Sequence, residues 1–337
     1  MIVKNKYSNI NSISPKQTLI SASWAAIFGH IQTLRFYSIT SAIGSELTLD
    51  LSTIIYINNS VSLYYICQVF DDVAVMIASL PMYDIVEVRH ALDALWTGMA
   101  RHFRHQGINH VPRRLTHDKP VSSLWSDDNM FISQCCGYDI VHGYKDRLQV
   151  LATPWFDVPG CSNGNYSSLI IVPEDSLFCD AIDMEGTVAV INGHESHSGM
   201  NTLFSLVAPH SQNNKFFSEI KISGSHAESL VLLKKRQAEV ASVDCITYEL
   251  LKRYRPAAIK GTRPLGFTYS APTPPYITRG KADMETFQRM QNALLETFED
   301  QTLADSRQRL LMNKIELTSA NLYQRIPDEF SHNLRAI

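Results

Sequence analysis

The sequence lacks any uninterrupted apolar run of about 18 residues, so no transmembrane helix or stable membrane insertion is expected. It also lacks an excess of positive charge, because 30 lysines and arginines stand against 33 aspartates and glutamates, a formal net charge of −3. Nucleic-acid-binding proteins usually carry a basic face, so this balance argues against a nucleic-acid partner. Any anionic ligand must therefore be held by local dipoles and hydrogen bonds rather than by a global positive field.

Cysteine is also scarce, and none of the six cysteines forms a C-x-x-C pair. Cys135 and Cys136 are adjacent, which is poor geometry for a bridge between them. This scatter favours a reducing compartment or ordinary buried thiols over a secreted disulfide framework. The start of the chain carries lysines, but Thr18–Ile31 is diluted by serines and a histidine and is no convincing signal peptide.

Histidine pairs at i, i+3 spacing, such as His102 with His105 and His194 with His197, suggest a metal site at first sight. No cysteine or carboxylate completes a convincing set of zinc ligands around them. We therefore expect no metal and no cofactor, and interpret these histidines as solvated helix residues.

The composition changes near residue 72. Residues 1–72 are rich in Ile, Ser, Asn and Thr and show no sustained helical or alternating pattern, so we expect an N-terminal appendage of uncertain structure. The run Val73–Leu80 is typical of a buried parallel strand. The segment from Asp84 to His105 has apolar residues at i, i+3, i+4 and i+7, which predicts an amphipathic helix.

Beyond this point apolar strand-like runs alternate with helical ones. Strands are expected near 113–115, 130–134, 148–152, 168–172, 187–191, 219–223, 240–243 and 264–268, and helices near 121–125, from 138, and at 199–208, 227–237, 247–254, 284–298 and 303–312. The alternation predicts an α/β protein with parallel sheets and helices on both faces. We expect two lobes, the first from residues 73–165 plus 260–330 and the second from 166–259, with the strand near 264–268 returning toward the first lobe.

The most informative turn follows the strand near 187–191. The strand ends at Asn192, a polar turn carries Ser196, His197 and Ser198, and a helix is expected from Gly199. Helix starts leave backbone N–H groups unpaired and carry partial positive charge, so this turn could cradle an anion. Simple N-capping of the helix by Ser198 is the alternative.

The same turn superficially resembles the nucleophile elbow of an esterase. That motif needs glycines two residues on either side of the serine, whereas Gly193 and Gly199 each lie three residues from Ser196. The spacing therefore disfavours an esterase.

Polar side chains also follow other predicted strands: Tyr83, Gln134, Tyr138, His226 and Asp244. Each alone is more often a helix cap or a core residue, but together they would line a cleft between two lobes. Asp244 beside an anion makes sense if it accepts a hydrogen bond from a protonated phosphate oxygen or pairs with a ligand ammonium. Capping of the following helix is the equally weighted alternative.

Residues from about 73 to 325 resemble the phosphate, phosphite and phosphonate substrate-binding proteins of ABC transporters. The resemblance rests on the segments Ala78–Asp84, Ser133–Tyr138, Tyr166–Val172, Ser196–Gly199, Ser223–His226, Val243–Cys245 and Pro274–Thr278. It implies a type-2 periplasmic-binding fold, whose two lobes are joined by a pair of crossing strands. It also implies that the anionic head of the ligand sits on the turn Ser196–Ser198, with Asp244 and the Tyr138 loop closing round it.

The resemblance further implies an ABC transporter permease as partner and a periplasmic location, although the unconvincing leader leaves the cytoplasm open. One departure is His197, where well-characterised phosphonate binders tend to have threonine between two serines. His197 could add a charged donor below about pH 6.5, or it could point away and leave its backbone N–H alone to serve.

We therefore expect a binding protein rather than an enzyme, one that clamps a small phosphate- or phosphonate-like anion for ABC-type uptake or sensing. The alternative is an enzyme on the same fold acting on a small anionic metabolite, for which Asp244 and His226 are the candidate acid–base pair.

Overall fold

The computed structural model describes residues 76–144, 147–211, 216–280 and 282–326, together with four short strands nearer the N-terminus. The chain divides into two compact units, Met1–Ala74 and Val75–Ile337. In the first unit, β1 (Leu19–Ile20) pairs with β2 (Phe36–Tyr37), and β3 (Ile55–Ile57) pairs with β4 (Ser60–Ser62), both antiparallel. Apart from these strands, the expected appendage of residues 1–72 lies outside the described residues.

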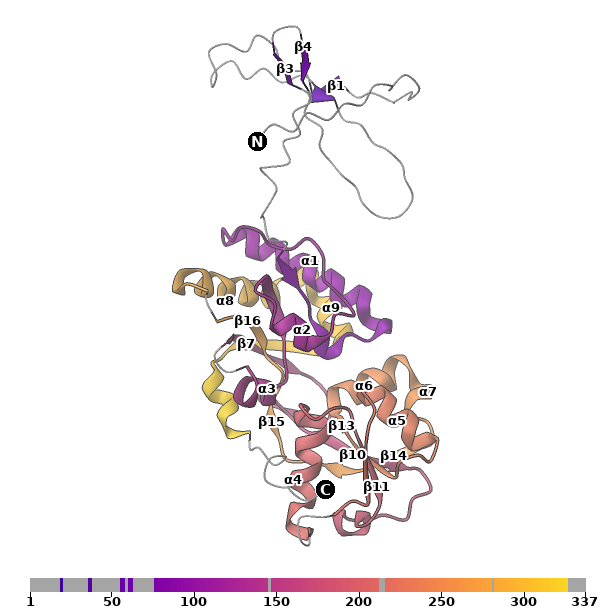
Figure 1. Cartoon of the computed structure of the whole chain (residues 1–337). Helices are drawn as coiled ribbons and strands as arrows, with labels where there is room; N and C mark the ends of the chain where they lie inside the picture. The colour runs from indigo at the N-terminus through magenta and orange to yellow at the C-terminus, as the bar shows by residue number, and fades with distance from the viewer. Residues whose placement is uncertain are drawn as a thin grey trace, which may run out of the picture. The chain divides into compact units, whose positions relative to one another are not determined.

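The second unit is built on two five-stranded sheets with helices packed around each (Figure 1). The first sheet has the order β17 (Met312–Leu317), β7 (Leu148–Phe156), β16 (Tyr276–Arg279), β6 (Met130–Gln134) and β5 (Ile77–Ala78). Only β5 and β6 run parallel, and the other neighbours are antiparallel. The helices of this half are α1 (Arg89–His105), α2 (Val121–Trp125), α3 (Gly137–His142), α8 (Met284–Glu299) and α9 (Ala304–Arg309).

The second sheet has the order β12 (Glu219–Ile222), β11 (Val188–Ile191), β13 (Val240–Asp244), β10 (Ser168–Pro173) and β14 (Thr262–Phe267). Strand β11 is parallel to both β12 and β13, whereas β10 is antiparallel to β13 and β14. The helices of this half are α4 (Thr202–Val207), α5 (His226–Lys234), α6 (Cys245–Tyr254) and α7 (Pro256–Ile259).

The chain crosses between the two sheets twice, and both crossings pass through a small third sheet. That sheet contains β8 (Cys161–Ser162) and β9 (Asn165–Tyr166) on the way out and β15 (Ala271–Pro272) on the way back. Two crossing segments of this kind form a hinge between two lobes, so the expected two-lobed α/β architecture is confirmed.

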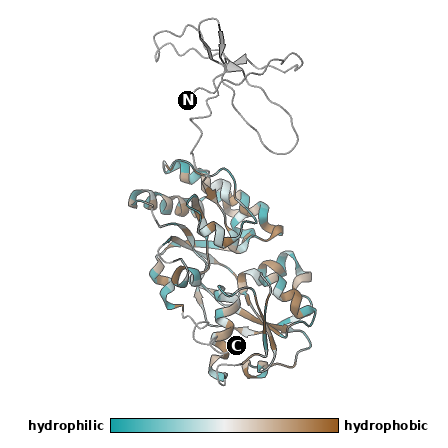
Figure 2. Ribbon diagram, in the orientation of Figure 1, coloured by the Kyte–Doolittle hydropathy of each residue, from teal (hydrophilic) through white to brown (hydrophobic). Residues whose placement is uncertain are grey.

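The apolar pattern of α1 explains how the first half packs. Leu92, Leu95, Trp96, Met99 and Phe103 lie on one helical face, and each is at most 1% exposed. This face packs toward the sheet, and the hydrophobic residues of both halves gather on the sheet strands and on inward helix faces (Figure 2). Within the part of the chain that the structure describes, no helix is both long enough and apolar enough to cross a lipid bilayer.

Both large sheets are mixed rather than parallel, which corrects one part of the expected fold class. An apolar run predicts that a strand is buried but does not predict its direction, because direction depends on the connections. The strand expected near 264–268 lies in β14 and pairs with β10, so it belongs to the second sheet instead of returning to the first. The division into lobes at residues 165 and 260 stays a prediction, and this pairing favours moving the second boundary past Phe267.

Several element boundaries also differ from expectation. The strand expected at Val73–Leu80 is described only as Ile77–Ala78, and Pro81 begins a 3-10 turn because proline cannot donate to a strand ladder. The helix expected from Asp84 begins at Arg89. The segment 113–115 forms only an isolated bridge from Leu115 to Ala78.

Near the C-terminus, the helix expected over 303–312 ends at Arg309, and Met312 opens β17. Only Met312 and Ile315 of that strand are buried, so its alternation is too weak to distinguish from a helical pattern.

Candidate functional site

A cavity of about 760 Å³ lies between the ends of the two sheets, a size typical of small-molecule sites. Tyr83, which follows β5, lines it from the first half, and Asp244, at the end of β13, lines it from the second. The Tyr83 hydroxyl donates a hydrogen bond of 3.2 Å to Asp244 Oδ2 across the cavity. The site therefore joins elements of both lobes, as a closing clamp requires.

The turn after β11 lines the cavity with Asn192, Ser196 and Ser198. Ser196 caps the helical turn that follows, because its Oγ accepts from the Gly199 N–H at 3.0 Å and its carbonyl accepts from two further amides. The cap is therefore Ser196 and not Ser198, the residue that the alternative interpretation named. Because Ser196 occupies these amides, the first helical N–H groups are not all free to bind a ligand.

Ser198 presents its hydroxyl next to His226, with Ser198 Oγ and His226 Nε2 3.0 Å apart. The backbone there is fixed, since Thr202 and Ser242 both donate hydroxyl hydrogen bonds to the Ser198 carbonyl. Burial lowers the pKa of His226 to about 4, so the imidazole is neutral near pH 7. The pair offers neutral hydrogen-bonding groups to the cavity, not a positive charge.

His197, in contrast, points away from the cavity into the protein. The residue is 1% exposed, its ring packs near Tyr166 and Tyr269, and its Nδ1 lies 3.1 Å from Asn201 Nδ2. Burial lowers the pKa of His197 to about 3, which favours the alternative in which the ring points away over the alternative of a charged donor. Its backbone N–H donates to Cys136 Sγ at 3.4 Å, so the backbone alternative is also occupied.

Three further candidates lie behind the cavity wall. Gln134 is 1% exposed on β6, and Tyr138 is 7% exposed with its ring 4.5 Å from that of His142. At Gly199 a side chain is sterically excluded, because a Cβ there would lie 1.8 Å from Asn192 Oδ1. Of the nine predicted site residues, the cavity thus brings together Tyr83, Ser196, Ser198, His226 and Asp244, and leaves Gln134, Tyr138, His197 and Gly199 outside its lining.

Asp244 fulfils the helix-capping alternative and lines the cavity as well. Its Oδ1 accepts from the backbone N–H groups of Ile246 and Thr247 at 2.7 and 2.9 Å, while Oδ2 accepts from Tyr83. Burial raises the pKa of Asp244 to about 6, although these three hydrogen bonds oppose the rise. The carboxyl is therefore partly protonated just below neutral pH.

Sequence reasoning missed Asp139, which also lines the cavity from the first turn of α3. It is 3% exposed, and burial together with the charge of Glu195 across the cavity raises its pKa to about 8. None of the described lysines or arginines forms an ion pair with it. Asp139 directly follows Tyr138, and nothing in the spacing of the sequence distinguishes the two as cavity-lining residues.

The cavity has acidic residues but no free cation among the residues described around it. Arg255 is the one arginine in the lining, and it is already paired with Glu87 through two hydrogen bonds of 2.5 and 2.9 Å. In the described ranges, no group of three histidine, cysteine or acidic side chains is placed to hold a metal ion. The described lining therefore offers hydroxyls, the imidazole of His226 and the carboxyls of Asp139 and Asp244 as polar groups.

Two lobes joined by two crossing segments, with a cavity between them, define this protein as one with a type-2 periplasmic-binding fold. A binding-protein component of an ABC phosphonate transporter from Pseudomonas aeruginosa aligns with a TM-score of 0.62 at 14% identity, over 77% of this chain and 86% of that one. PhnD1 from Prochlorococcus marinus, in complex with methylphosphonate, aligns with a TM-score of 0.58 at 12% identity, over 74% and 95% of the two chains. XAC2383 from Xanthomonas citri, bound to chloride, aligns with a TM-score of 0.59 at 13% identity, over 77% and 97%.

The sequence itself identifies the family. Residues 128–322 match the model of the ABC transporter, phosphonate, periplasmic substrate-binding proteins, and this chain belongs to that family. A search of curated protein sequences returned no significant match. The family consists of substrate-binding proteins of ABC transporters and not of enzymes, so the expectation of a binding protein is confirmed and the enzyme alternative has no support.

Proposed function

We propose that this protein binds a phosphonate-class anion in the cavity between its lobes and delivers it to an ABC transporter permease. The observation that carries the proposal is the position of Ser196 and Ser198, which line the same cavity as Asp244 of their own half and Tyr83 of the other half. Hydroxyl groups on a turn at the end of a strand, beside a helix start, are suited to bind phosphonate oxygens. Closure would bury the anion between the two halves.

The acidic residues restrict the protonation state of the complex. A carboxylate repels an anion at close range, but a protonated carboxyl donates a hydrogen bond to it. With pKa values raised to about 8 and about 6, Asp139 and Asp244 hold protons over a pH range where ordinary aspartates do not. Alternatively, a ligand ammonium pairs with the ionised carboxyls, as an aminoalkylphosphonate would allow.

The residues behind the wall have supporting roles in this proposal. Gly199 leaves room for the Asn192 side chain, and His197 holds the turn through Asn201. Gln134 and Tyr138 shape the first lobe beneath the cavity without direct ligand contact. The proposed direct contacts are therefore Tyr83, Asp139, Ser196, Ser198, His226 and Asp244.

Titration calorimetry on the full chain tests the proposal with phosphate, methylphosphonate, aminomethylphosphonate and sulfate, each at pH 5.5, 7.5 and 9. We expect one site that binds at least one phosphonate more tightly than sulfate. If the protonated carboxyls donate, the affinity for methylphosphonate falls as the pH rises through 8. If a ligand ammonium pairs with them, aminomethylphosphonate keeps its affinity at pH 9, where both carboxyls are ionised, while methylphosphonate loses it. Absence of phosphonate binding at every pH contradicts the proposal.

A further inference from the structure

Two cysteines far apart in the sequence meet beside the cavity. Cys161 Sγ and Cys245 Sγ lie 3.6 Å apart, although 84 positions separate them in the chain, and both thiols are free. Cys161 lies on β8, in the first crossing from one sheet to the other, whereas Cys245 is the first residue of α6 in the second half. The pair therefore joins the hinge to one lobe.

The backbone around both sulfurs is held by hydrogen bonds. The Cys245 N–H donates to the Ser167 carbonyl at 3.2 Å, and the Ser167 N–H donates to the Gly160 carbonyl at 2.9 Å. Gly160 has a φ of +94°, and a Cβ there would lie 3.1 Å from Cys245 Cβ. The crossing segment thus lies directly against the start of α6, and the absence of a side chain at Gly160 permits this approach.

A disulfide between these cysteines needs little movement. The S–S bond is about 2.05 Å long, so the sulfurs must approach by about 1.5 Å, which side-chain torsions can supply where the backbones already lie close. We propose that Cys161 and Cys245 form a reversible disulfide that tethers the hinge to the start of α6 and hinders opening of the cavity. Nothing in the phosphonate-binding chemistry of the site requires these thiols.

A small-molecule disulfide can serve as the oxidant for this bond. Cys161 is partly exposed whereas Cys245 is fully buried, so Cys161 reacts first. Its thiolate attacks one sulfur of the oxidant, forms a mixed disulfide and expels one thiolate, which takes up the proton that Cys161 lost. Cys245 then loses its proton and attacks Cys161 Sγ, which releases the second small thiol. Two protein thiols are oxidised, and one external disulfide is reduced to two thiols.

The electrostatic surroundings set the speed of the first step. The hydrogen bond with Cys245, followed by burial, raises the pKa of Cys161 above its ordinary value. Only a small fraction is thiolate near pH 7, so oxidation should be slow there and accelerate as the pH rises.

The proposed disulfide would lie next to the hydrogen bond between Tyr83 and Asp244, which joins the two halves at the cavity. Cys245 directly follows Asp244, whose carboxylate accepts the hydrogen bond from Tyr83 of the opposite half. Fixing Cys245 to the hinge restrains the position of Asp244 relative to the crossing segment. The effect on ligand release rests on the proposed function, whereas formation of the bond and its effect on stability do not.

The test uses the full chain with oxidised glutathione at pH 8.5, followed by alkylation of the remaining thiols, protease digestion and mass spectrometry. Cys161→Ser and Cys245→Ala each remove one partner, and Cys179→Ser, which removes an exposed thiol elsewhere, is the matched control. We expect a peptide that links residues 161 and 245 in the wild type and in the Cys179 variant, and its absence from the other two.

Closing a loop of this length should raise the melting temperature by about 5 to 15 °C, reversibly with dithiothreitol. Stopped-flow measurement should then show slower release of methylphosphonate from the oxidised protein. If methylphosphonate does not bind, the proposed function fails, but the linked peptide and the thermal shift still support the disulfide. The proposed disulfide is overturned if the peptide linking residues 161 and 245 is not found. It is also overturned if oxidation raises the melting temperature of Cys161→Ser and Cys245→Ala as much as that of the wild type.

Discussion

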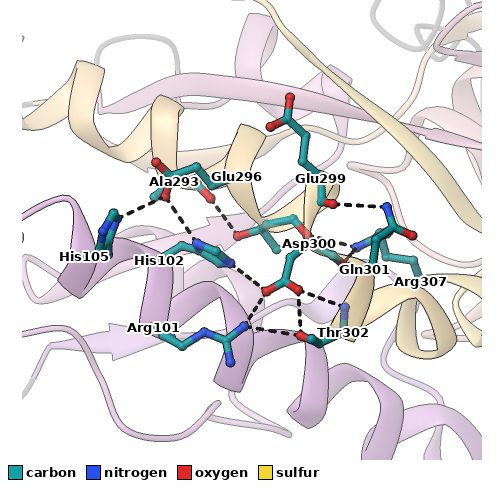
Figure 3. A network of polar contacts seen from close by, with 11 residues as sticks. Arg101, His102, His105, Ala293, Glu296, Glu299, Asp300, Gln301, Thr302 and Arg307 are labelled. Atoms are coloured by element: carbon teal, nitrogen blue, oxygen red, sulfur yellow. Dashed lines mark hydrogen bonds and ion pairs between the residues drawn. The ribbon is translucent and has the colours of Figure 1, made fainter.

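The cavity and a polar network on the outside of the first half both contain buried or half-buried aspartates, yet the two environments shift their pKa values in opposite directions. In the network, Asp300 accepts hydrogen bonds from Arg101, from His102 Nε2 at 2.9 Å and from Thr302 (Figure 3). These partners lower the pKa of Asp300 below its usual range. In the cavity, Asp139 has no such cation, and its pKa rises to about 8.

The network has a structural purpose that the cavity lacks. His102 on α1 also lies 3.2 Å from Glu296 on α8, and Arg307 on α9 donates to the carbonyls of Thr297 and Asp300. Charges of both signs meet there and fasten three helices together. A carboxyl that is paired with cations within the protein contributes to the fold, whereas one that lines a cavity without a cationic partner is available to a ligand.

Asp139→Asn should produce the largest effect on stability. The folded-state pKa of Asp139 is raised, so the stability that its protonated carboxyl contributes is complete below about pH 4 and is lost as the pH rises through about 8. The amide cannot ionise, so we expect the variant to be more stable at pH 8 by about 3 kcal/mol, or roughly 6 to 12 °C. Thermal unfolding at pH 4.5 and 8 measures this. Asp128→Asn, at an exposed position, is the control. If Asp139→Asn differs from the wild type in stability by the same amount at both pH values, Asp139 is not held protonated.

The double variant Ser196→Ala with Ser198→Ala should reduce phosphonate affinity at least about tenfold, because one or two hydrogen bonds to a charged ligand are lost. Loss of the Ser196 cap also lowers stability by about 1 kcal/mol, so binding is measured well below the melting temperature. Ser211→Ala with Ser218→Ala is the matched control, since these hydroxyls donate only to backbone carbonyls outside the cavity. Unchanged affinity in calorimetry would refute the proposal that Ser196 and Ser198 bind the phosphonate.

Asp300→Asn should act oppositely to Asp139→Asn. The depressed folded-state pKa gives stability that is present above about pH 4 and disappears as the pH falls through the folded-state value. We expect a loss of about 1 kcal/mol at pH 7, or roughly 2 to 4 °C, because the network lies near water and is partly screened. Asp305→Asn, which breaks an exposed helix pair with Arg309, should change stability much less. If Asp300→Asn were more stable than the wild type at pH 7, Asp300 in the network and Asp139 in the cavity would no longer differ in their effect on stability.

Much of this fold could be predicted from local patterns. The buried face of α1 follows from helical spacing, and the bounds of α2 and β6 agree with those expected. Strand direction and the weak alternation of β17 could not be predicted, because they depend on contacts between distant segments. At the candidate site, the polar residues after predicted strands pointed to the region of the cavity. Which of them faces the cavity depends on tertiary packing, which places Asp139 in the cavity lining and leaves His197 and Tyr138 outside it.

His197→Gln should have the smallest effect on ligand binding. It tests, from within the turn Ser196–Ser198, whether the cavity is neutral where the network around Asp300 is charged. The ring is buried and its pKa is lowered to about 3, so it carries no charge at pH 5 to 7 and supplies no titrating donor. Glutamine is neutral and can keep a hydrogen bond toward Asn201, so the affinity for methylphosphonate should change with pH between 5 and 7 as it does in the wild type. Calorimetry at three pH values in that range measures this dependence. If the wild type alone tightens its binding as the pH falls through 6, His197 does charge and face the anion, and the neutral character of the site is wrong.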